Sequence, residues 1–220
     1  MVPTPNIEAI VRGWRLSGAC DLGAGATRSQ LTAAQTFLGR TFPSDMIDLY
    51  SHCDGGDILE GNLQLYPLDG SDFSVTKSSS FLRNNQWPIP EELVVFAGDG
   101  TGDSFGLWLP TAEHHAPLVI EVGGIFEEGS FAIVGTSLSA FLRGRTAYYL
   151  LLLECPAQAL DALEVPRSLR AGADELGDDE YDALARWSDP GLPQLPLSAY
   201  RARLTARDIR DAASRRLTTA

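Results

Sequence analysis

Residues 94–109 decide the fold; they read Val-Val-Phe-Ala-Gly-Asp-Gly-Thr-Gly-Asp-Ser-Phe-Gly-Leu-Trp-Leu. Two apolar runs, 93–97 and 105–109, flank a turn rich in glycine and aspartate. β-Branched and aromatic residues on both sides of such a turn predict a hairpin at the centre of a sheet. Asp99 and Asp103 are each placed to accept hydrogen bonds from backbone N–H groups of the turn. The functional alternative is that the rigid hairpin projects these two carboxylates into the surface of a partner.

Three helices are predicted before the hairpin. Apolar residues recur at helical spacing over 7–16. Thr27 and Gln30 form a capping box that starts a second helix, and Gly39 is placed to end it. The third helix is expected to begin at Ser44. Its predicted buried face consists of Met46, Ile47, Leu49, Tyr50 and Cys53.

Further strands are predicted at 63–68, 118–122 and 131–134, because short apolar runs are followed there by turn residues. The polar stretch 69–85 shows little periodicity and is expected to be a long loop. Thr136 or Ser137 is expected to cap a last core helix. Helices first, then grouped strands, then a helix predict an α+β fold. We expect a single mixed or antiparallel sheet of about four to six strands flanked by helices.

The composition changes at both ends of the chain. Residues 1–26 are predicted to be an N-terminal helix and connector, and 27–155 the main domain. Residues 156–220 are predicted to be a mostly helical C-terminal extension with a proline-rich linker and an arginine-rich terminal helix. The segment 198–220 has six arginines and two aspartates and therefore a net charge of +4. Because the whole chain has a net charge of −12, residues 1–197 carry a net charge of −16.

Such an acidic chain is unsuited to general binding of nucleic acid or anionic membranes and favours cationic partners. The longest apolar run, 147–153, is far shorter than the roughly 20 residues of a membrane helix. The N-terminus lacks the pattern of a secretory signal, so we expect a cytoplasmic protein. Lys77 is the only lysine, and the abundant alanine, glycine and arginine are typical of a GC-rich bacterial coding sequence.

The sequence offers little for catalysis or metal binding. His52 and Cys53 are neighbours, but adjacent helical residues point about 100° apart, which suits a buried structural thiol better than a nucleophile. Glu113, His114 and His115 form one small group of potential ligands without a second cluster. The glycines of the hairpin turn are followed by no lysine and flanked by aspartates that would repel phosphate. We therefore predict no enzyme activity, cofactor or metal.

Three segments occur in an order that resembles one known family. They are 31–50, containing Phe-Leu-Gly and then Phe-Pro-Ser-Asp; 53–56, Cys-Asp-Gly-Gly; and 90–105, with the hairpin. Together they resemble the SUKH superfamily, the Smi/Knr-type domain of bacterial toxin-immunity proteins and fungal cell-wall regulators, over about 27–154. Asp54 stands where the family usually has asparagine, and Phe42 where it has leucine. The resemblance implies a non-enzymatic α+β binding module, often one that neutralises a toxin, and supplies no universal binding residues.

We predict a protein-binding module, specifically an immunity protein that neutralises a cognate basic toxin by direct binding, with a nuclease as the candidate kind of toxin. The predicted contacts are Asp54, Asp57, Trp87, Asp99 and Asp103. An alternative is a regulatory scaffold that binds a host factor through the C-terminal extension. A second alternative is a hydrolase that uses Cys53 or a carboxylate. Contact of the arginine-rich tail with nucleic acid is expected to be weak and salt-dependent, without specificity.

Overall fold

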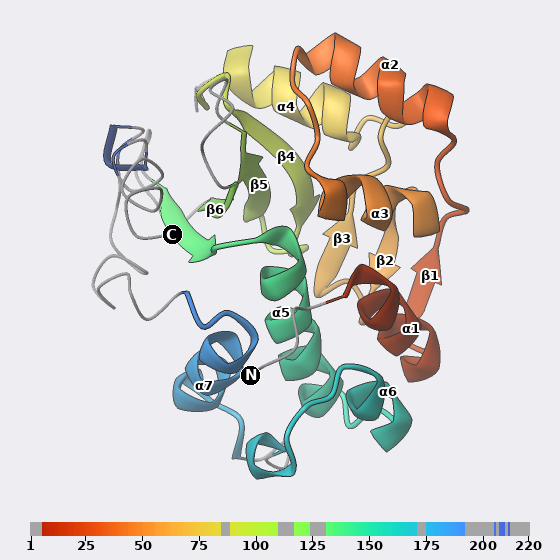
Figure 1. The fold of residues 1–220 in the computed structure, drawn as a ribbon, viewed down its shortest axis with the longest axis vertical. Helices are drawn as coiled ribbons and strands as arrows, with labels where there is room; N and C mark the ends of the chain where they lie inside the picture. The colour runs from red at the N-terminus through yellow and green to blue at the C-terminus, as the bar shows by residue number, and fades with distance from the viewer. Residues whose placement is uncertain are drawn as a thin grey trace.

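The computed structural model describes residues 6–84, 89–109, 117–123, 131–170, 175–191, 205, 207–209 and 211. Within them, one antiparallel sheet has seven strands in chain order (Figure 1). The strands are β1 (Cys20–Leu22), β2 (Gly56–Ile58), β3 (Leu63–Leu65), β4 (Leu93–Gly98), β5 (Ser104–Trp108), β6 (Leu118–Val122) and β7 (Ala132–Gly135). The helices are α1 (Ile7–Ser17), α2 (Arg28–Leu38), α3 (Ser44–His52), α4 (Val75–Asn84), α5 (Leu138–Leu152), α6 (Ala157–Ala162), the 3-10 turn η1 (Arg167–Leu169) and α7 (Asp178–Ser188). The protein is therefore α+β, as predicted.

The predicted number of about four to six strands is too low, because two strands lie where none was expected. β1 lies in the stretch 18–26, predicted to be a connector, and β2 follows α3 closely. Each has three residues, too few for an alternating pattern to be detected. Cys20 lies opposite Ile58 across the β1–β2 pair, so a partner far along the chain selects the extended conformation.

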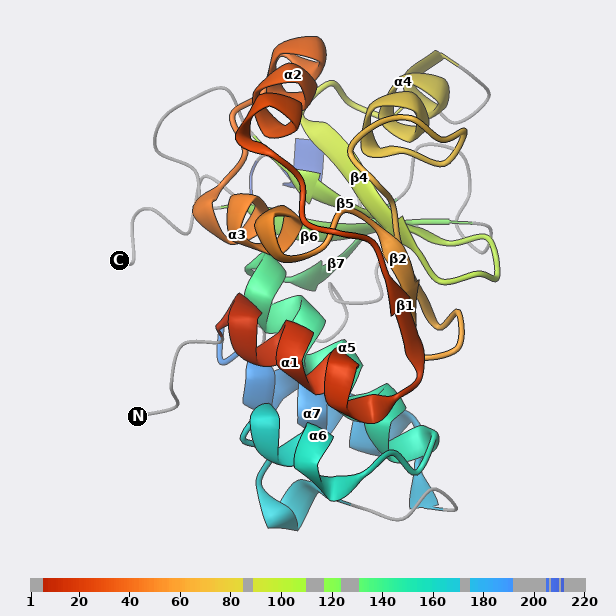
Figure 2. The ribbon, with the colours of Figure 1, turned by 90° about the vertical axis from the view of Figure 1, so that its right-hand side faces the viewer.

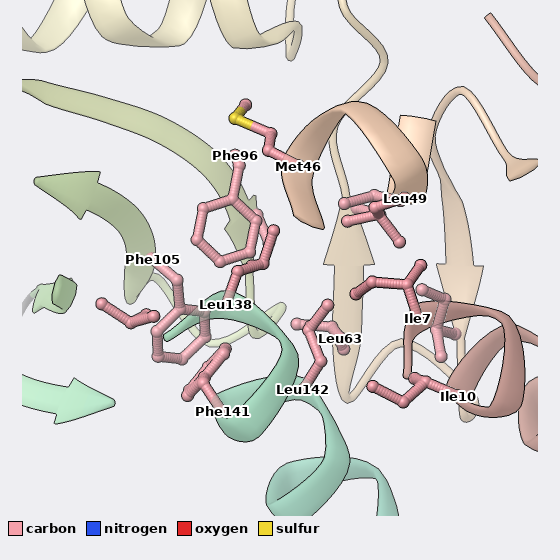
Figure 3. Packing of buried hydrophobic residues seen from close by; sticks show 14 of the residues in the cluster. Ile7, Ile10, Met46, Leu49, Leu63, Phe96, Phe105, Leu138, Phe141 and Leu142 are labelled. Atoms are coloured by element: carbon pink, nitrogen blue, oxygen red, sulfur yellow. The ribbon is translucent and has the colours of Figure 1, made fainter. Parts of the chain in front are cut away.

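One face of the sheet is covered by α3 and α5 (Figure 3). Phe141 of α5 packs against two aromatic rings of the central hairpin, with ring centroids 5.1 Å from Phe105 and 6.3 Å from Phe96. Met46 of α3 and Leu142 of α5 are fully buried in the same cluster. Burial of aromatic and aliphatic side chains on this face is the main stabilising contribution to the fold.

Residues 69–85, predicted to be a loop, contain the helix α4 instead. The helix lies beside the start of β4, beyond the end of the pairing with β3. Ser79 accepts a hydrogen bond from the N–H of Val95 (2.9 Å), and Arg83 donates to the carbonyl of Leu93 (3.1 Å). These side chains satisfy backbone groups that β3 does not reach. Serine has a modest helix propensity, so it is the contact with β4 that favours the helix.

Of the two predicted caps of α5, Thr136 and Ser137, it is Ser137 whose hydroxyl accepts a hydrogen bond from Ala140 N–H. The helix is buried on nearly all sides, because elements from both ends of the chain pack around it. The indole of Trp14 in α1 donates to the hydroxyl of Thr146 (2.8 Å). From the other end, the Ser188 hydroxyl donates to the Ala140 carbonyl (2.6 Å). In Figure 2, α1, α5, α6 and α7 accordingly form one helical layer below the sheet.

The second face of the sheet is divided into two halves. Over β4–β7 it is apolar and buried, and Ile209 from the predicted arginine-rich helix joins this cluster with no exposed surface. A capping box between Thr205 and Asp208 precedes Ile209. Over β1–β3, the same face carries the exposed side chains of Asp21, Asp57 and Gln64 instead.

Each of two helices is followed by a glutamate in the left-handed backbone conformation. Substitution of these glutamates by glycine should distinguish the effect of backbone strain on stability from the effect of an ion pair. Glu154 (φ 50°) follows α5 and Glu164 (φ 56°) follows α6, a position that favours glycine. Glu154→Gly is expected to raise the free energy of unfolding by about 0.5–1 kcal/mol. Glu164→Gly should gain less, because it also removes an ion pair (3.7 Å) with the buried Arg143. Urea denaturation measures both variants, and equal gains would show that this ion pair contributes nothing.

Candidate partner-binding surface

The turn of the central hairpin is built around Asp99. One carboxylate oxygen accepts the N–H groups of Thr101 (2.9 Å) and Asp103 (3.1 Å), and the other accepts the Thr101 hydroxyl (2.9 Å). Gly100 and Gly102 have φ values of 76° and 119°, which only glycine adopts at low cost. The predicted turn with Asp99 as an acceptor is thus confirmed.

The same aspartate also faces the core helix. The Arg145 guanidinium of α5 lies 4.0 Å from the second oxygen of Asp99, and the two side chains are only 9% and 13% exposed. Arg145 also lies over the ring of Phe105, at 4.4 Å from its centroid. Asp103 is half-buried, with its carboxylate against Gly123. A partner contact through Asp99 would therefore compete with the contacts that hold the turn, and its role in binding stays a prediction.

Asp54 connects the end of α3 to the chain leaving β3. Its carboxylate accepts the N–H of Leu68 (2.7 Å), and its own N–H donates to the carbonyl of Ala24. Burial raises the pKa of Asp54, an effect opposed by the Leu68 hydrogen bond and reinforced by the charge of Asp69. These contacts give Asp54 a structural role; whether it also binds a partner stays a prediction.

Asp57 is the predicted site residue with the most open surroundings. It lies directly opposite Asp21 of β1 on one side and Gln64 of β3 on the other, and all three side chains are exposed. Glu60 is exposed in the adjoining β2–β3 turn. We call Asp21, Asp57, Glu60 and Gln64 the edge patch. No ion pair among the described residues involves its three carboxylates.

Like charges placed directly opposite each other destabilise an antiparallel pair. The Asp21–Asp57 arrangement therefore costs the free protein some stability and leaves a concentrated negative potential at one end of the sheet. Asp21 was not among the predicted site residues. Its place beside Asp57 depends on the β1–β2 register, which the sequence of the connector does not indicate.

The remaining sequence candidates are placed as follows. Trp87 and the group Glu113, His114 and His115 lie outside the described residues. Cys53 is fully buried, its thiol lies 3.7 Å from the carbonyl oxygen of Leu49, and burial raises its pKa to about 12. Such a thiol is protonated at neutral pH and is a poor nucleophile. Among the described residues, no group of three or more His, Cys, Asp or Glu side chains is arranged to hold a metal ion.

A groove that the sequence did not predict lies between the starts of α1, α3 and α5. It has a volume of about 920 Å³ and is lined by Ile47, Asp48, Pro43 and Pro117 among others. Ile47 was predicted to be buried but is 38% exposed, because it points away from the Met46–Leu49 face of α3. Ile47 is thus an apolar residue on the outer side of α3, and this position in the sequence is the feature that could have indicated the groove.

Both carboxylates of the groove already have partners. Asp45 accepts the N–H groups of Met46 (3.0 Å) and Ser139 (3.3 Å), so it caps the start of α5; burial raises its pKa in spite of these bonds. Asp48 lies 3.6 Å from the His52 imidazole. The carboxylates of the groove are therefore engaged within the protein, whereas those of the edge patch form no ion pair with any described residue.

Comparison with known families identifies the class of protein. The profile of the SMI1/KNR4 family (SUKH-1) matches residues 25–144, more than half of the chain. The chain belongs to this family, and membership is consistent with a toxin-immunity or protein-binding module. The match includes Asp57 and Glu60 but ends inside α5, and it leaves α1, β1, α6 and α7 outside. No curated protein sequence matches the chain. Among the described residues, no helix is long and apolar enough to span a membrane.

Proposed function

We propose that this protein is a non-enzymatic immunity protein that neutralises a basic toxin by binding it directly through the edge patch. The observation that carries the proposal is the pair Asp21 and Asp57, which lie opposite each other and form no ion pair with any residue that the structure describes. A basic surface that covers them would replace a repulsion by two attractions. The family and the net charge of −12 support the same class of partner.

The electrostatic field also gives the proposal a kinetic rationale. A strongly negative domain raises the association rate of a positive partner, most markedly at low salt. Toxins that cleave nucleic acid need a basic cleft for their substrate. An acidic protein seated over such a cleft would compete with the substrate for the same cations, so inhibition would need no chemistry from the inhibitor.

The scaffold alternative assigns partner binding to the C-terminal extension. The contacts of this extension point inward: Ser188 and Asp189 hold α7 against the start of α5, and Ile209 is buried on the sheet. The extension thus already contributes to the packing of the domain. Removal of 198–220 uncovers the face of β4–β7 that Ile209 covers and should lower stability, but it leaves the edge patch in place. Capture of the toxin should therefore persist in the folded variant, whereas the scaffold alternative requires that capture be lost.

Charge reversal at the edge patch is expected to weaken partner capture about tenfold, since each reversed charge removes roughly 0.7 kcal/mol of attraction. The variant is Asp21→Lys with Asp57→Lys. It would be compared with the wild type in a pull-down from the native cell, washed at low and then at moderate salt. The expected result is one basic protein, released by salt from the wild type and recovered poorly with the variant.

The matched control is Glu175→Lys with Asp179→Lys, which changes the net charge equally at two exposed residues near the start of α7. If this control weakens capture as much as the edge-patch variant, net charge rather than the patch governs binding. Recovery of housekeeping proteins that depend on 198–220 would contradict the proposal and favour the scaffold.

A further inference from the structure

The strand β1 forms one edge of the seven-stranded sheet, and among the strands that the structure describes it pairs with β2 alone. In Figure 2 this edge faces the viewer, and none of the other described strands lies outside it. The edge continues past Leu22, since Gly23 donates to the carbonyl of Gly55 and Ala24 accepts from the N–H of Asp54. The extended segment is therefore longer than the three residues of the strand itself.

The register shows which backbone groups point outward. In an antiparallel pair, opposite residues alternate between those that exchange backbone hydrogen bonds and those that do not. The bond from Gly23 to Gly55 makes the next such pair Asp21 with Asp57. The N–H and C=O groups of Cys20 and Leu22 consequently point away from β2, and none of the backbone hydrogen bonds described outside the ladder involves them.

The two sides of this edge differ in chemistry. Cys20 and Leu22 turn their side chains toward the helical layer, where they pack against the main core but stay partly exposed. Asp21 points to the opposite side together with Asp57. A strand added here would place alternate side chains against these two environments, because successive side chains point to opposite faces. The complementary strand alternates apolar and basic residues.

We propose that the outer edge of β1 accepts one strand of a basic partner, which extends the sheet to an eighth strand. The partner's backbone pairs with Cys20 and Leu22, its apolar side chains cover the exposed parts of these two residues, and its arginine or lysine side chains face Asp21 and Asp57. This inference rests on the proposed function, because it takes the basic toxin as the source of the strand. It adds the mode of recognition, in which the backbone contributes affinity and the aspartates contribute specificity.

Charge also determines which strands are rejected. A second copy of this chain that paired through the same edge would bring its own Asp21 beside the first, and like charges oppose that pairing. Charged residues on edge strands are a common protection against association of identical chains. The same aspartates that repel a second copy of this chain attract a basic strand, so they both oppose self-association and favour the partner.

The test uses the full chain and a short synthetic peptide of alternating valine and arginine. Binding is measured by calorimetry, and exchange of individual backbone amides by NMR. On binding, exchange of the Cys20 and Leu22 amides is expected to slow at least about tenfold, as new hydrogen bonds protect them. The amide of Asp21, already bonded to β2, should change little and serves as the internal control.

A peptide of the same sequence with every backbone nitrogen methylated keeps the charges but loses the backbone hydrogen-bond donors, and should bind at least about tenfold more weakly.

The protein variant is Asp21→Asn with Asp57→Asn. It should bind the peptide more weakly while the free protein becomes slightly more stable, because the mutual repulsion is removed. A purely structural role for these aspartates would instead lower binding and stability together. Glu175→Asn with Asp179→Asn is the control for net charge and should bind like the wild type.

Three results would overturn the inference: equal binding of the methylated peptide, unchanged exchange at Cys20 and Leu22, or self-association of the wild type through this edge. If the peptide binds as expected but the pull-down yields no basic toxin, the edge accepts strands and the proposed function fails. If a basic toxin is captured but the peptide is not bound at the edge, the function stands and the strand-addition mode fails.

Discussion

Replacement of Trp14 by alanine is expected to lower the free energy of unfolding by about 3–5 kcal/mol, the range for a large aromatic side chain deleted from a packed core. Trp14 has no exposed surface and lies in the main cluster. Its indole N–H donates to the Thr146 hydroxyl of α5, which is itself only 1% exposed. The substitution therefore opens a cavity and leaves a buried hydroxyl without its donor.

Two further variants separate packing from hydrogen bonding. Thr146→Val keeps the shape but leaves the indole N–H without an acceptor, at a cost of about 1–3 kcal/mol. Arg12→Ala, on the exposed side of the same helix, should change stability by less than about 0.5 kcal/mol. Denaturation in urea with an unchanged slope would show that the native fold is retained in each variant.

This result bears on the extent of the folded unit, because α1 lies outside the part of the chain that matches the family. If Trp14→Ala were as mild as Arg12→Ala, α1 would be an appendage on a domain that is stable without it. A loss of several kcal/mol with a single cooperative transition would make α1 part of the same unit as α5. The division into 1–26, 27–155 and 156–220 would then describe the sequence but not the unit that folds.

The sequence predicts the elements whose ends carry local signals. Thr27 and Gln30 form the predicted capping box, Gly39 ends α2 in the left-handed conformation, and Ser137 caps α5. The strands of the central hairpin and β6 consist mostly of apolar residues between turn residues. In each case the residues that determine the helix end or the strand lie within a few positions of it, so local sequence patterns are sufficient to predict it.

The elements that the sequence did not predict depend on distant partners. β1 and β2 are extended because they pair with each other, and α4 is helical where Ser79 and Arg83 bind the edge of β4. The edge patch follows the same rule. Asp57 was predicted from its place among clustered carboxylates, but its relation to Asp21 arises from register. Ile47 is exposed because α3 presents another face to the sheet.

Replacement of Asp99 by alanine is expected to destabilise the protein by about 2–4 kcal/mol, since it removes three turn hydrogen bonds and leaves Arg145 buried without its nearest carboxylate. Asp99→Asn should cost less than this, because the remaining carbonyl oxygen can still accept the N–H groups of Thr101 and Asp103. Thermal and urea denaturation of both variants would measure the effects. The simple expectation for an aspartate that only contacts a partner is the opposite: no change in stability and a loss of binding.

A double-mutant cycle with Arg145→Met isolates the contribution of the Asp99–Arg145 contact from that of the turn. If the contact stabilises the fold, Asp99→Ala should cost about 1 kcal/mol less in the Arg145→Met background, because no buried charge is then left alone. No coupling would leave the turn hydrogen bonds as the whole effect. The cycle also decides how binding data on the hairpin must be interpreted. With a large coupling, weaker partner capture by Asp99→Ala reports a displaced hairpin rather than a lost contact. Variants at the edge patch then report a direct contact, because Asp57 forms no such ion pair with the described residues.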